Sequence, residues 1–142
     1  MQLNRNQPTR CLVDGVFDLF HVGHLNIIER ANQNFDHCFI GLNDDAFVAQ
    51  FKGKTPVIPY ADRRRILQSI RYVDGVIPMD GEHCYTVDFL DQHNIDALVH
   101  GGHLSEYCKT LFAPLMDSGR YVEYDETPHI HSSRIVEICR QR

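Results

Sequence analysis

The sequence contains no apolar run that approaches the ~20 residues needed to cross a membrane. Its first ten residues, MQLNRNQPTR, contain no apolar core, so we expect no signal peptide and a cytoplasmic protein. Internal repeats, low-complexity tracts and long linkers are also absent from the sequence. A chain of 142 residues is close to the common size of one domain. We therefore expect a single domain over residues 1–142, with residues 1–9 flexible.

An excess of positive charge is missing as well. Fourteen Lys and Arg residues against nineteen Asp and Glu residues give a formal net charge of −5, which argues against a general nucleic-acid-binding surface. A local site for a small anion is compatible with this balance. Residues 52–71 contain a single acidic residue, Asp62. The cations of the same segment are Lys52, Lys54, Arg63, Arg64, Arg65 and Arg71.

The cysteine pattern contains no redox or zinc motif. The five cysteines are odd in number and widely scattered, and no two of them form a CxxC pair. We interpret them as reduced residues that belong mostly to the core. They are Cys11, Cys38, Cys84, Cys108 and Cys139.

Short apolar segments alternate with segments of helical periodicity along the chain. Strands are expected at residues 11–13, 37–42, 75–78, 97–99 and 121–124. Apolar residues at helical spacing predict helices around residues 25–31, 66–73, 86–92 and 104–115. Ser132 is positioned to cap a last helix. The alternation predicts an α/β fold, a Rossmann-like doubly wound five-stranded parallel sheet with helices on both faces.

The loops after the strands are the expected place for chemistry, because such sheets bind ligands outside the carboxyl ends of their strands. The first loop, residues 14–24, reads DGVFDLFHVGH and opens a predicted helix. Free N–H groups at a helix start form an anion site, and Gly15 and Gly23 allow close approach of the backbone. His21 and His24 fall on one side of the first turn and suit a polyphosphate. Two alternatives remain open. One histidine could cap the helix while the other lies at the surface, or the two histidines could bind a metal ion, although no further zinc ligand is evident.

GVFDLFHVGH resembles the GxFDxxHxGH signature of the cytidylyltransferase-like nucleotidyltransferases. The resemblance covers nearly the whole chain and extends to Arg63, to IRYVD at residues 70–74 and to a degraded ISTT motif at residues 130–133. The sequence is most similar to the enzymes that act on glycerol 3-phosphate and phosphoethanolamine. The resemblance implies transfer of CMP from CTP to a small phosphorylated alcohol, with release of pyrophosphate.

The resemblance also implies which residues contact phosphate. The two histidines of HxGH, here His21 and His24, contact the NTP phosphates and stabilise the transition state. Lys52 stands where the family has a phosphate-binding lysine, and Lys54 is a second candidate. His21, His24 and Lys52 are therefore the predicted catalytic residues. From the residues alone, the two lysines also suit a solvated basic loop.

Further roles follow from the same resemblance. Arg63 and Arg71 match family arginines and are predicted to hold the substrate phosphate, although Arg71 also suits a helix C-terminus. Asp74 is assigned a hydrogen bond near the base, with helix capping as the alternative, and Asp18 is expected to brace the loop. The predicted nucleotide-binding residues are Gly15, Val16, Phe17, His21, His24, Asp74, Gly101, Ser132 and Ser133.

Two stretches depart from the family pattern. Where the family runs close to RTxGISTT, this chain has Glu126, His129 and His131 at the arginine, the glycine and the first serine. A carboxylate repels phosphate, so either histidine supplies the missing donor or the loop binds differently. Residues 100–103 read HGGH, where relatives often have GDD, GND or GGD. A metal site would be an alternative use of His100, His103, His129 and His131.

The implied partners are CTP and a small phosphorylated alcohol, without nucleic acid or membrane. Mg²⁺ is the expected cofactor, bound through the nucleotide phosphates, and no metal-binding residue of the protein is predicted. Small relatives are commonly dimeric, so we expect a homodimer. Two other functions remain open. One is adenylyl transfer from ATP within the same superfamily, and the other is nucleotide binding without catalysis, which the substitutions at Glu126 and His103 motivate.

Overall fold

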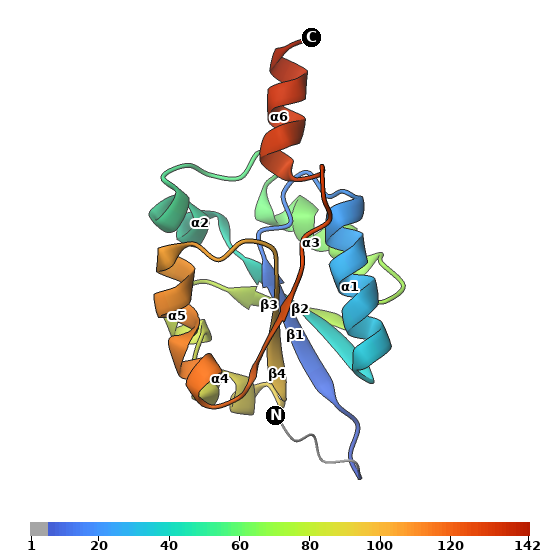
Figure 1. The fold of residues 1–142 in the computed structure, drawn as a ribbon, viewed down its shortest axis with the longest axis vertical. Helices are drawn as coiled ribbons and strands as arrows, with labels where there is room; N and C mark the ends of the chain where they lie inside the picture. Colours follow the sequence, from blue (N-terminus) through green and yellow to red (C-terminus); the bar gives the residue numbers. More distant parts are fainter. Residues whose placement is uncertain (1–5) are drawn as a thin grey trace.

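A parallel sheet forms the centre of the computed structural model, which describes residues 6–142 (Figure 1). The strands are β1 (Arg10–Gly15), β2 (His37–Asn43), β3 (Gly75–Met79), β4 (Ala97–Gly101) and β5 (Tyr121–Tyr124). They lie in the order β3-β2-β1-β4-β5, and every pairing is parallel. The predicted five-stranded parallel sheet is therefore confirmed. The strand order reverses between β1 and β4, which is where such sheets bind ligands.

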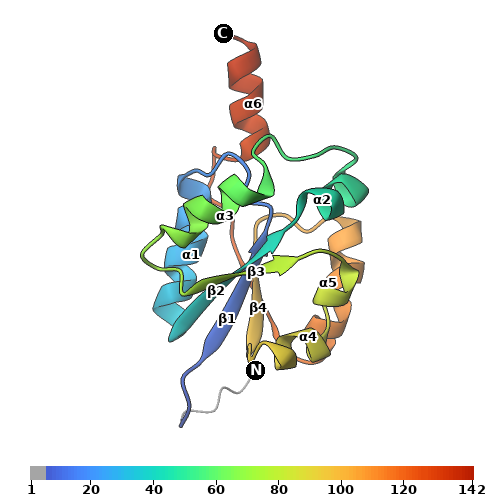
Figure 2. The ribbon, with the colours of Figure 1, turned by 180° about the vertical axis from the view of Figure 1, so that it is seen from behind.

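Helices cover both faces of the sheet (Figures 1 and 2). One face is covered by α1 (Val22–Asn34) and α3 (Tyr60–Gln68), and the other by α2 (Asp45–Lys52), α4 (Val87–Gln92) and α5 (Glu106–Asp117). A short 3₁₀ turn, η1 (Glu82–Cys84), lies between β3 and α4, and α6 (Ser132–Arg140) ends the chain. No described helix combines the length and the apolar character that crossing a bilayer would need.

Residues of β1 alternate between two apolar cores. Cys11 and Val13 pack on the side of α1 with Ile28, whereas Leu12 packs on the side of α5 with Phe112. Alternation of this kind is what a strand covered on both faces requires. All five cysteines lie in the described part of the chain and are free, and three of them are buried.

The first described residues are joined to β2. Residues 1–5 of the segment predicted to be flexible lie outside the described residues. Thr9 N donates to Asp36 Oδ2 at 2.7 Å, and His37 N donates to Thr9 O at 2.9 Å. Thr9 is therefore held by the sheet immediately before β1 begins.

The helix predicted around residues 66–73 begins and ends earlier in the structure. α3 ends at Gln68, and the chain then turns, with Ile70 N donating to Leu67 O at 3.2 Å. Ile70 and Val73 still pack against the core, but from turns. These two residues are apolar because they pack against the core from turns. Their helical spacing from Ile66 therefore predicted a longer helix than the structure contains.

Segment 43–54, in which the sequence pattern predicts no helix, contains α2. The Asp44 carboxylate caps this helix by accepting a hydrogen bond from Phe47 N at 2.8 Å. Phe47 and its neighbour are buried, so one face of this short helix belongs to the core. The helix ends at Lys52, and Gly53 turns the chain with a φ of 75°, a conformation that glycine adopts without steric cost.

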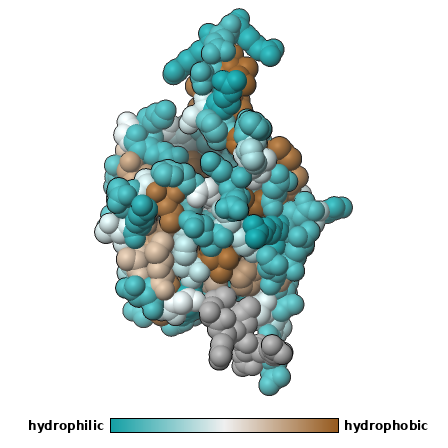
Figure 3. Space-filling view, viewed as in Figure 1, coloured by the Kyte–Doolittle hydropathy of each residue, from teal (hydrophilic) through white to brown (hydrophobic). Residues whose placement is uncertain are grey.

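α6 projects from the body (Figure 1), and apolar residues are visible on it among hydrophilic ones (Figure 3). Its cap is His131, whose Nδ1 accepts a hydrogen bond from Arg134 N at 3.0 Å. Ser132, the predicted cap, instead donates its hydroxyl hydrogen to Asp18 O at 2.6 Å. This contact fixes the start of α6 to the loop after β1.

Arg63 is buried, with 1% of its surface exposed. Its Nη1 donates to Val16 O at 2.7 Å and to Asn43 O at 2.9 Å. Its Nε donates to Ile58 O at 2.8 Å, and its Nη2 lies 2.7 Å from an Asp45 carboxylate oxygen. The guanidinium is enclosed and already bonded to four protein acceptors, so the structure does not present Arg63 to a substrate phosphate as predicted.

Arg63→Ala is expected to lower the free energy of unfolding by about 3 to 5 kcal/mol, because buried carbonyl groups and Asp45 lose their partner. Arg65→Ala, at an exposed position of the same helix, is the matched control and should stay within about 0.5 kcal/mol of the unaltered protein. Urea unfolding measures both. Equal stabilities of the two variants would contradict a structural role for Arg63.

Candidate active site

A cavity of about 820 Å³ lies at the carboxyl ends of the strands. Its walls come from the loop after β1, from α2 and α5 and from the start of α6. Open α/β sheets bind their ligands at this position. The predicted site residues that line it are Gly15, Val16, Phe17, His24, Lys52, Gly101, Ser132 and Ser133.

His21 and His24 form a reciprocal cap at the start of α1. His21 Nδ1 accepts a hydrogen bond from Gly23 N at 3.0 Å, and His24 Nδ1 accepts one from His21 N at 3.2 Å. The two rings stack with 3.8 Å between their centroids. Because both Nδ1 atoms are acceptors, each neutral ring carries its proton on Nε2. His24 lines the cavity, and the buried Nε2 of His21 has no hydrogen-bond partner among the described residues.

Both imidazoles of this pair are neutral at pH 7. Burial and, to a smaller extent, the nearby His21 lower the pKa of His24 to about 4. Burial also lowers the pKa of His21, with a smaller contribution from His131. Neutral N–H donors beside the free N–H groups of a helix start suit phosphate oxygens. The same tautomer disfavours the metal-pair alternative, because a metal ion can bind Nε2 only after this nitrogen has lost its proton.

Lys52 and Lys54 both line the cavity. Burial lowers the pKa of Lys52, and the Asp18 carboxylate opposes this shift. The two oxygens of Asp18 accept hydrogen bonds from Val57 N at 2.7 Å and Ile58 N at 2.9 Å. Asp18 therefore braces the loop, as the sequence predicts, and holds the segment after Lys54 against the loop after β1.

The floor of the cavity contains a buried polar network that the sequence analysis missed. Asp14 Oδ1 lies 2.8 Å from His100 Nδ1, and the Tyr85 hydroxyl donates to Asp14 Oδ2 at 3.0 Å. Asn43 Nδ2 donates to the Tyr85 hydroxyl at 2.9 Å. Burial alone would lower the pKa of His100, but charge interactions and hydrogen bonds, chiefly with Asp14, outweigh burial and raise this pKa. Asp14, Asn43 and His100 stand near the ends of adjacent strands, and this alignment was the available signal.

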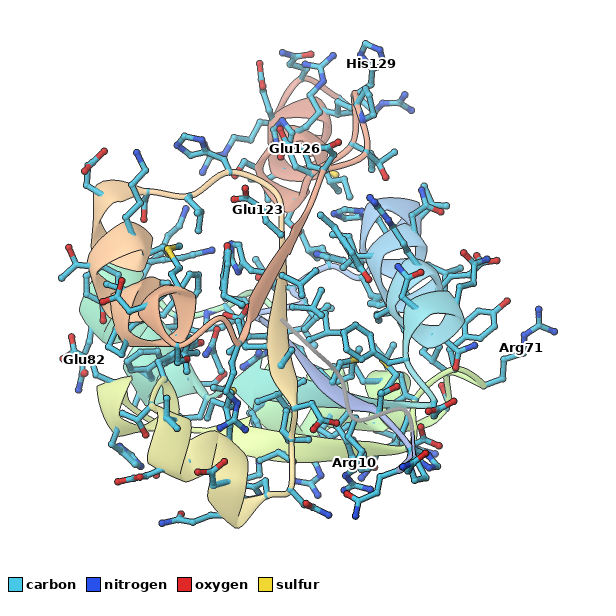
Figure 4. All side chains as sticks on the ribbon, turned by 60° about the horizontal axis from the view of Figure 1, so that its bottom comes forward. Arg10, Arg71, Glu82, Glu123, Glu126 and His129 are labelled. Atoms are coloured by element: carbon cyan, nitrogen blue, oxygen red, sulfur yellow. The ribbon has the colours of Figure 1, made fainter. Side chains whose placement is uncertain are left out.

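Arg71 and Asp74 do not reach the cavity. Asp74 precedes β3 and accepts a hydrogen bond from Cys38 N at 2.8 Å, near the amino ends of the strands. Arg71 donates to the Tyr72 hydroxyl at 2.7 Å and points away from the body (Figure 4). The structure therefore places Arg71 and Asp74, which are predicted to contact substrate and nucleotide, outside the main cavity. The reason is the early end of α3, after which the chain runs to the opposite edge of the sheet.

Two of the residues that break the family pattern, His103 and Glu126, line a second, smaller cavity of about 350 Å³, and His103 also lines the main cavity. Glu126 and His129, labelled in Figure 4, lie between β5 and α6, and neither lines the main cavity. The Glu126 carboxylate therefore does not enter the main cavity. Among residues 6–142, His100, His103, His129 and His131 form no set of metal ligands.

A family model and several similar proteins agree on the family of this chain. The sequence model described as cytidylyltransferase-like matches residues 12–138. Choline-phosphate cytidylyltransferase 2 of Arabidopsis thaliana is 33% identical over 144 residues, which cover 92% of this chain and 44% of that protein. Glycerol-3-phosphate cytidylyltransferase of Bacillus subtilis is 37% identical over 107 residues, with coverages of 70% and 81%. FAD synthase of Pyrococcus abyssi is 32% identical over 127 residues, with coverages of 89% and 84%.

The chain thus spans less than half the length of the Arabidopsis relative. A solved structure shares the fold, namely the lipopolysaccharide core biosynthesis protein from Thermoplasma volcanium GSS1. Its TM-score is 0.65 at 20% identity, and the match covers 87% of this chain and 100% of that one. At this identity the likeness supports the Rossmann-like fold alone.

His24→Asn tests whether His24 is buried in its neutral form. The pKa of His24 in the fold, about 4, lies below the ordinary 6.5, so the unfolded chain binds the proton more readily. Stability from this group is present above pH 6.5 and is lost as the pH falls toward about 4. We expect the unfolding free energy of the unaltered protein to fall more steeply across this window than that of His24→Asn.

His129→Asn is the matched control for this experiment. His129 is exposed and has a φ of 70°, which asparagine tolerates. Its variant should keep the pH dependence of the unaltered protein in urea unfolding. A slope for His24→Asn equal to that of the control would show that His24 is not a buried neutral group.

Proposed function

Because the chain belongs to the cytidylyltransferase-like family, we propose that it transfers CMP from CTP to a small phosphorylated alcohol of the glycerol 3-phosphate or phosphoethanolamine type. Pyrophosphate is the second product. The observation that carries the proposal is the stacked pair of His21 and His24 at a helix start beside the main cavity. Similarity to the glycerol-3-phosphate and choline-phosphate cytidylyltransferases supports the choice of CTP.

The start of α1 is the proposed binding place of the triphosphate. Its free N–H groups and the Nε2–H groups of His21 and His24 are donors for phosphate oxygens. A buried donor without a partner is costly, and the Nε2 of His21 is such a donor among the described residues. A phosphate oxygen would satisfy it. Donors that are already fixed in place stabilise the charge that grows on these oxygens during displacement.

The start of α6 supplies a second set of donors to the same cavity. Ser132 and Ser133 both line it, and the backbone N–H groups of a helix start favour anions. The hydroxyl of Ser132 is bonded to Asp18 O, so it fixes the position of this helix start. The triphosphate is thus proposed to lie between two helix starts.

The acceptor phosphate is proposed to bind at Lys52, and Lys54 and Arg140 also line the cavity. One of its oxygens attacks the α-phosphorus of CTP in line, a P–O bond forms, and the bond to pyrophosphate breaks. The attacking oxygen is already anionic, so no general base is needed. No covalent intermediate with the protein is needed either, and the protein acts through positioning and charge stabilisation.

Mg²⁺ is proposed to bind through the nucleotide phosphates and to neutralise part of their charge. Binding through the phosphates alone fits the two cavity carboxylates Asp14 and Asp18, because both already have hydrogen-bond partners in the protein. Asp14 is bonded to His100 and Tyr85, and Asp18 to two backbone N–H groups.

The expected homodimer stays a prediction.

Adenylyl transfer is the second candidate function, and the similarity to FAD synthase of Pyrococcus abyssi favours it. Thermal-shift measurements with CTP and with ATP distinguish the two nucleotides. The proposal predicts greater stabilisation by CTP. Equal or greater stabilisation by ATP would favour adenylyl transfer.

A pyrophosphate-release assay with CTP, Mg²⁺ and a panel of phosphorylated alcohols tests the proposal directly. We expect release with at least one phosphorylated alcohol and none with the matching alcohol that lacks phosphate. His24→Asn keeps an acceptor for the cap but lacks the Nε2 donor, and should lower turnover roughly 100-fold. Absence of release with every acceptor, from protein that CTP stabilises against heat, would favour binding without catalysis.

Lys52→Ala and Lys54→Ala form a matched pair that tests the proposed acceptor site. Lys52→Ala should lower kcat/KM for the phosphorylated alcohol by roughly 100-fold, because a cation beside the reacting phosphate is lost. Lys54→Ala should change it less than about tenfold. A larger effect at Lys54 than at Lys52 would contradict the assignment.

A further inference from the structure

Three potential metal ligands meet outside the main cavity, on the turn between β3 and α4. His83 Nε2 lies 3.1 Å from Asp80 Oδ1, and Cys84 Sγ lies 3.6 Å from each of these two atoms. Glu82, labelled in Figure 4, belongs to the same turn and marks its place on the surface. Among residues 6–142, no other three His, Cys, Asp or Glu side chains bring their ligand atoms this close together.

The local backbone holds these three side chains in place. Cys84 N donates to Gly81 O at 3.2 Å, and the Thr86 hydroxyl donates to His83 O at 3.0 Å. A Cβ atom at Gly81 would lie 2.9 Å from His83 Nδ1, so the imidazole packs closely over this glycine. Its packing leaves Nε2 directed at Asp80. The arrangement is therefore set by the turn itself and not by chance contact of two long side chains.

The cluster has a closed side and an open side. Cys84 is 1% exposed, whereas the side chains of His83 and Asp80 are 70% and 62% exposed. An ion from solvent can therefore approach past the imidazole and the carboxylate and reach the sulfur. One coordination position would stay on the solvent side, where water can occupy it.

The two 3.6 Å distances to sulfur match those of a tetrahedral site, and the 3.1 Å between nitrogen and oxygen is slightly shorter. Zinc bonds of about 2.0 to 2.1 Å to nitrogen, 2.0 to 2.2 Å to oxygen and 2.3 Å to sulfur place the ligand atoms about 3.4 to 3.6 Å apart. A thiolate with an imidazole selects a transition metal over Mg²⁺ or Ca²⁺. We propose that Asp80, His83 and Cys84 bind a divalent transition-metal ion of the Zn²⁺ type, with water as the fourth ligand.

Binding exchanges one proton for the ion. Cys84 Sγ donates its hydrogen to Asp80 Oδ1 in the metal-free protein, and burial raises the pKa of this thiol. The ion takes the place of that hydrogen, the thiolate and the carboxylate become its ligands, and the proton leaves to solvent. His83 coordinates through Nε2 as a neutral ring.

The proposed ion would stabilise the floor of the main cavity from outside. Tyr85, next to Cys84 in the chain, is 2% exposed and donates its hydroxyl hydrogen to Asp14. Glu82 accepts a hydrogen bond from the Tyr107 hydroxyl at 2.9 Å, and Tyr107 lines the cavity. An ion that fixes the turn therefore fixes two cavity residues without touching a reactant. The proposed ion therefore has a structural role and no catalytic one.

Titration of the reduced, full-length protein with Co²⁺ tests the proposal. A Co²⁺ ion bound by a thiolate gives a sulfur-to-metal charge-transfer band, and tetrahedral coordination gives visible absorption. We expect both, at one ion per chain, with displacement by Zn²⁺. Binding should also raise the midpoint of thermal unfolding. The exposed Cys139 serves as the control, so Cys139→Ser should leave the titration unchanged.

Substitutions of the three proposed ligands test whether they bind the ion. Cys84→Ser should abolish the charge-transfer band. Since Cys84 is buried, His83→Ala and Asp80→Asn provide exposed changes that leave the fold intact, and each should weaken Zn²⁺ binding at least about tenfold. The proposal is overturned if no such band forms, if it survives Cys84→Ser, or if both exposed variants bind as tightly as the unaltered protein.

Discussion

The buried guanidinium of Arg63 holds together the parts from which the main cavity is built. It bonds Val16 O in the loop after β1, Asn43 O at the end of β2 and Asp45 at the start of α2. Val16 and Asn43 line the cavity, and α2 ends in Lys52. A buried charge is tolerated only while its donors stay bonded, so these parts cannot move independently at low energetic cost. The position of the candidate phosphate-binding groups therefore depends on a cation enclosed by the protein.

Two helix starts face the same cavity, and both are capped by histidine. His21 Nδ1 and His131 Nδ1 each accept a backbone N–H. At the start of α1, this cap leaves Nε2 of the neutral His24, which lines the cavity, as a hydrogen-bond donor without formal charge. Lys52 and Lys54 supply positive charge at its edge. This arrangement makes the proposed polyanion site compatible with a chain whose net charge is −5.

The sheet and the loop of residues 14–24 could be predicted because their signals are local. Alternating apolar segments encode parallel strands, and glycines with paired histidines encode a turn that leads into a capped helix start. Arg63 could not be assigned, because its burial depends on Val16, 47 residues away, while Arg64 beside it has the same side chain. The bond between Asp14 and His100 spans 86 residues and was missed for the same reason. Long-range packing decides which of several similar side chains enters the site.

The central claim is that neutral imidazoles at the start of α1 donate Nε2–H hydrogen bonds to nucleotide phosphates. Nitrogen-15 NMR of the histidine rings at pH 7, recorded with and without CTP, tests it most directly. The account predicts that His21 and His24 are neutral with the proton on Nε2, and that CTP shifts both Nε2 signals while each Nδ1 remains an acceptor. Protonated rings in the free protein, or Nε2 signals that CTP does not change, would contradict it.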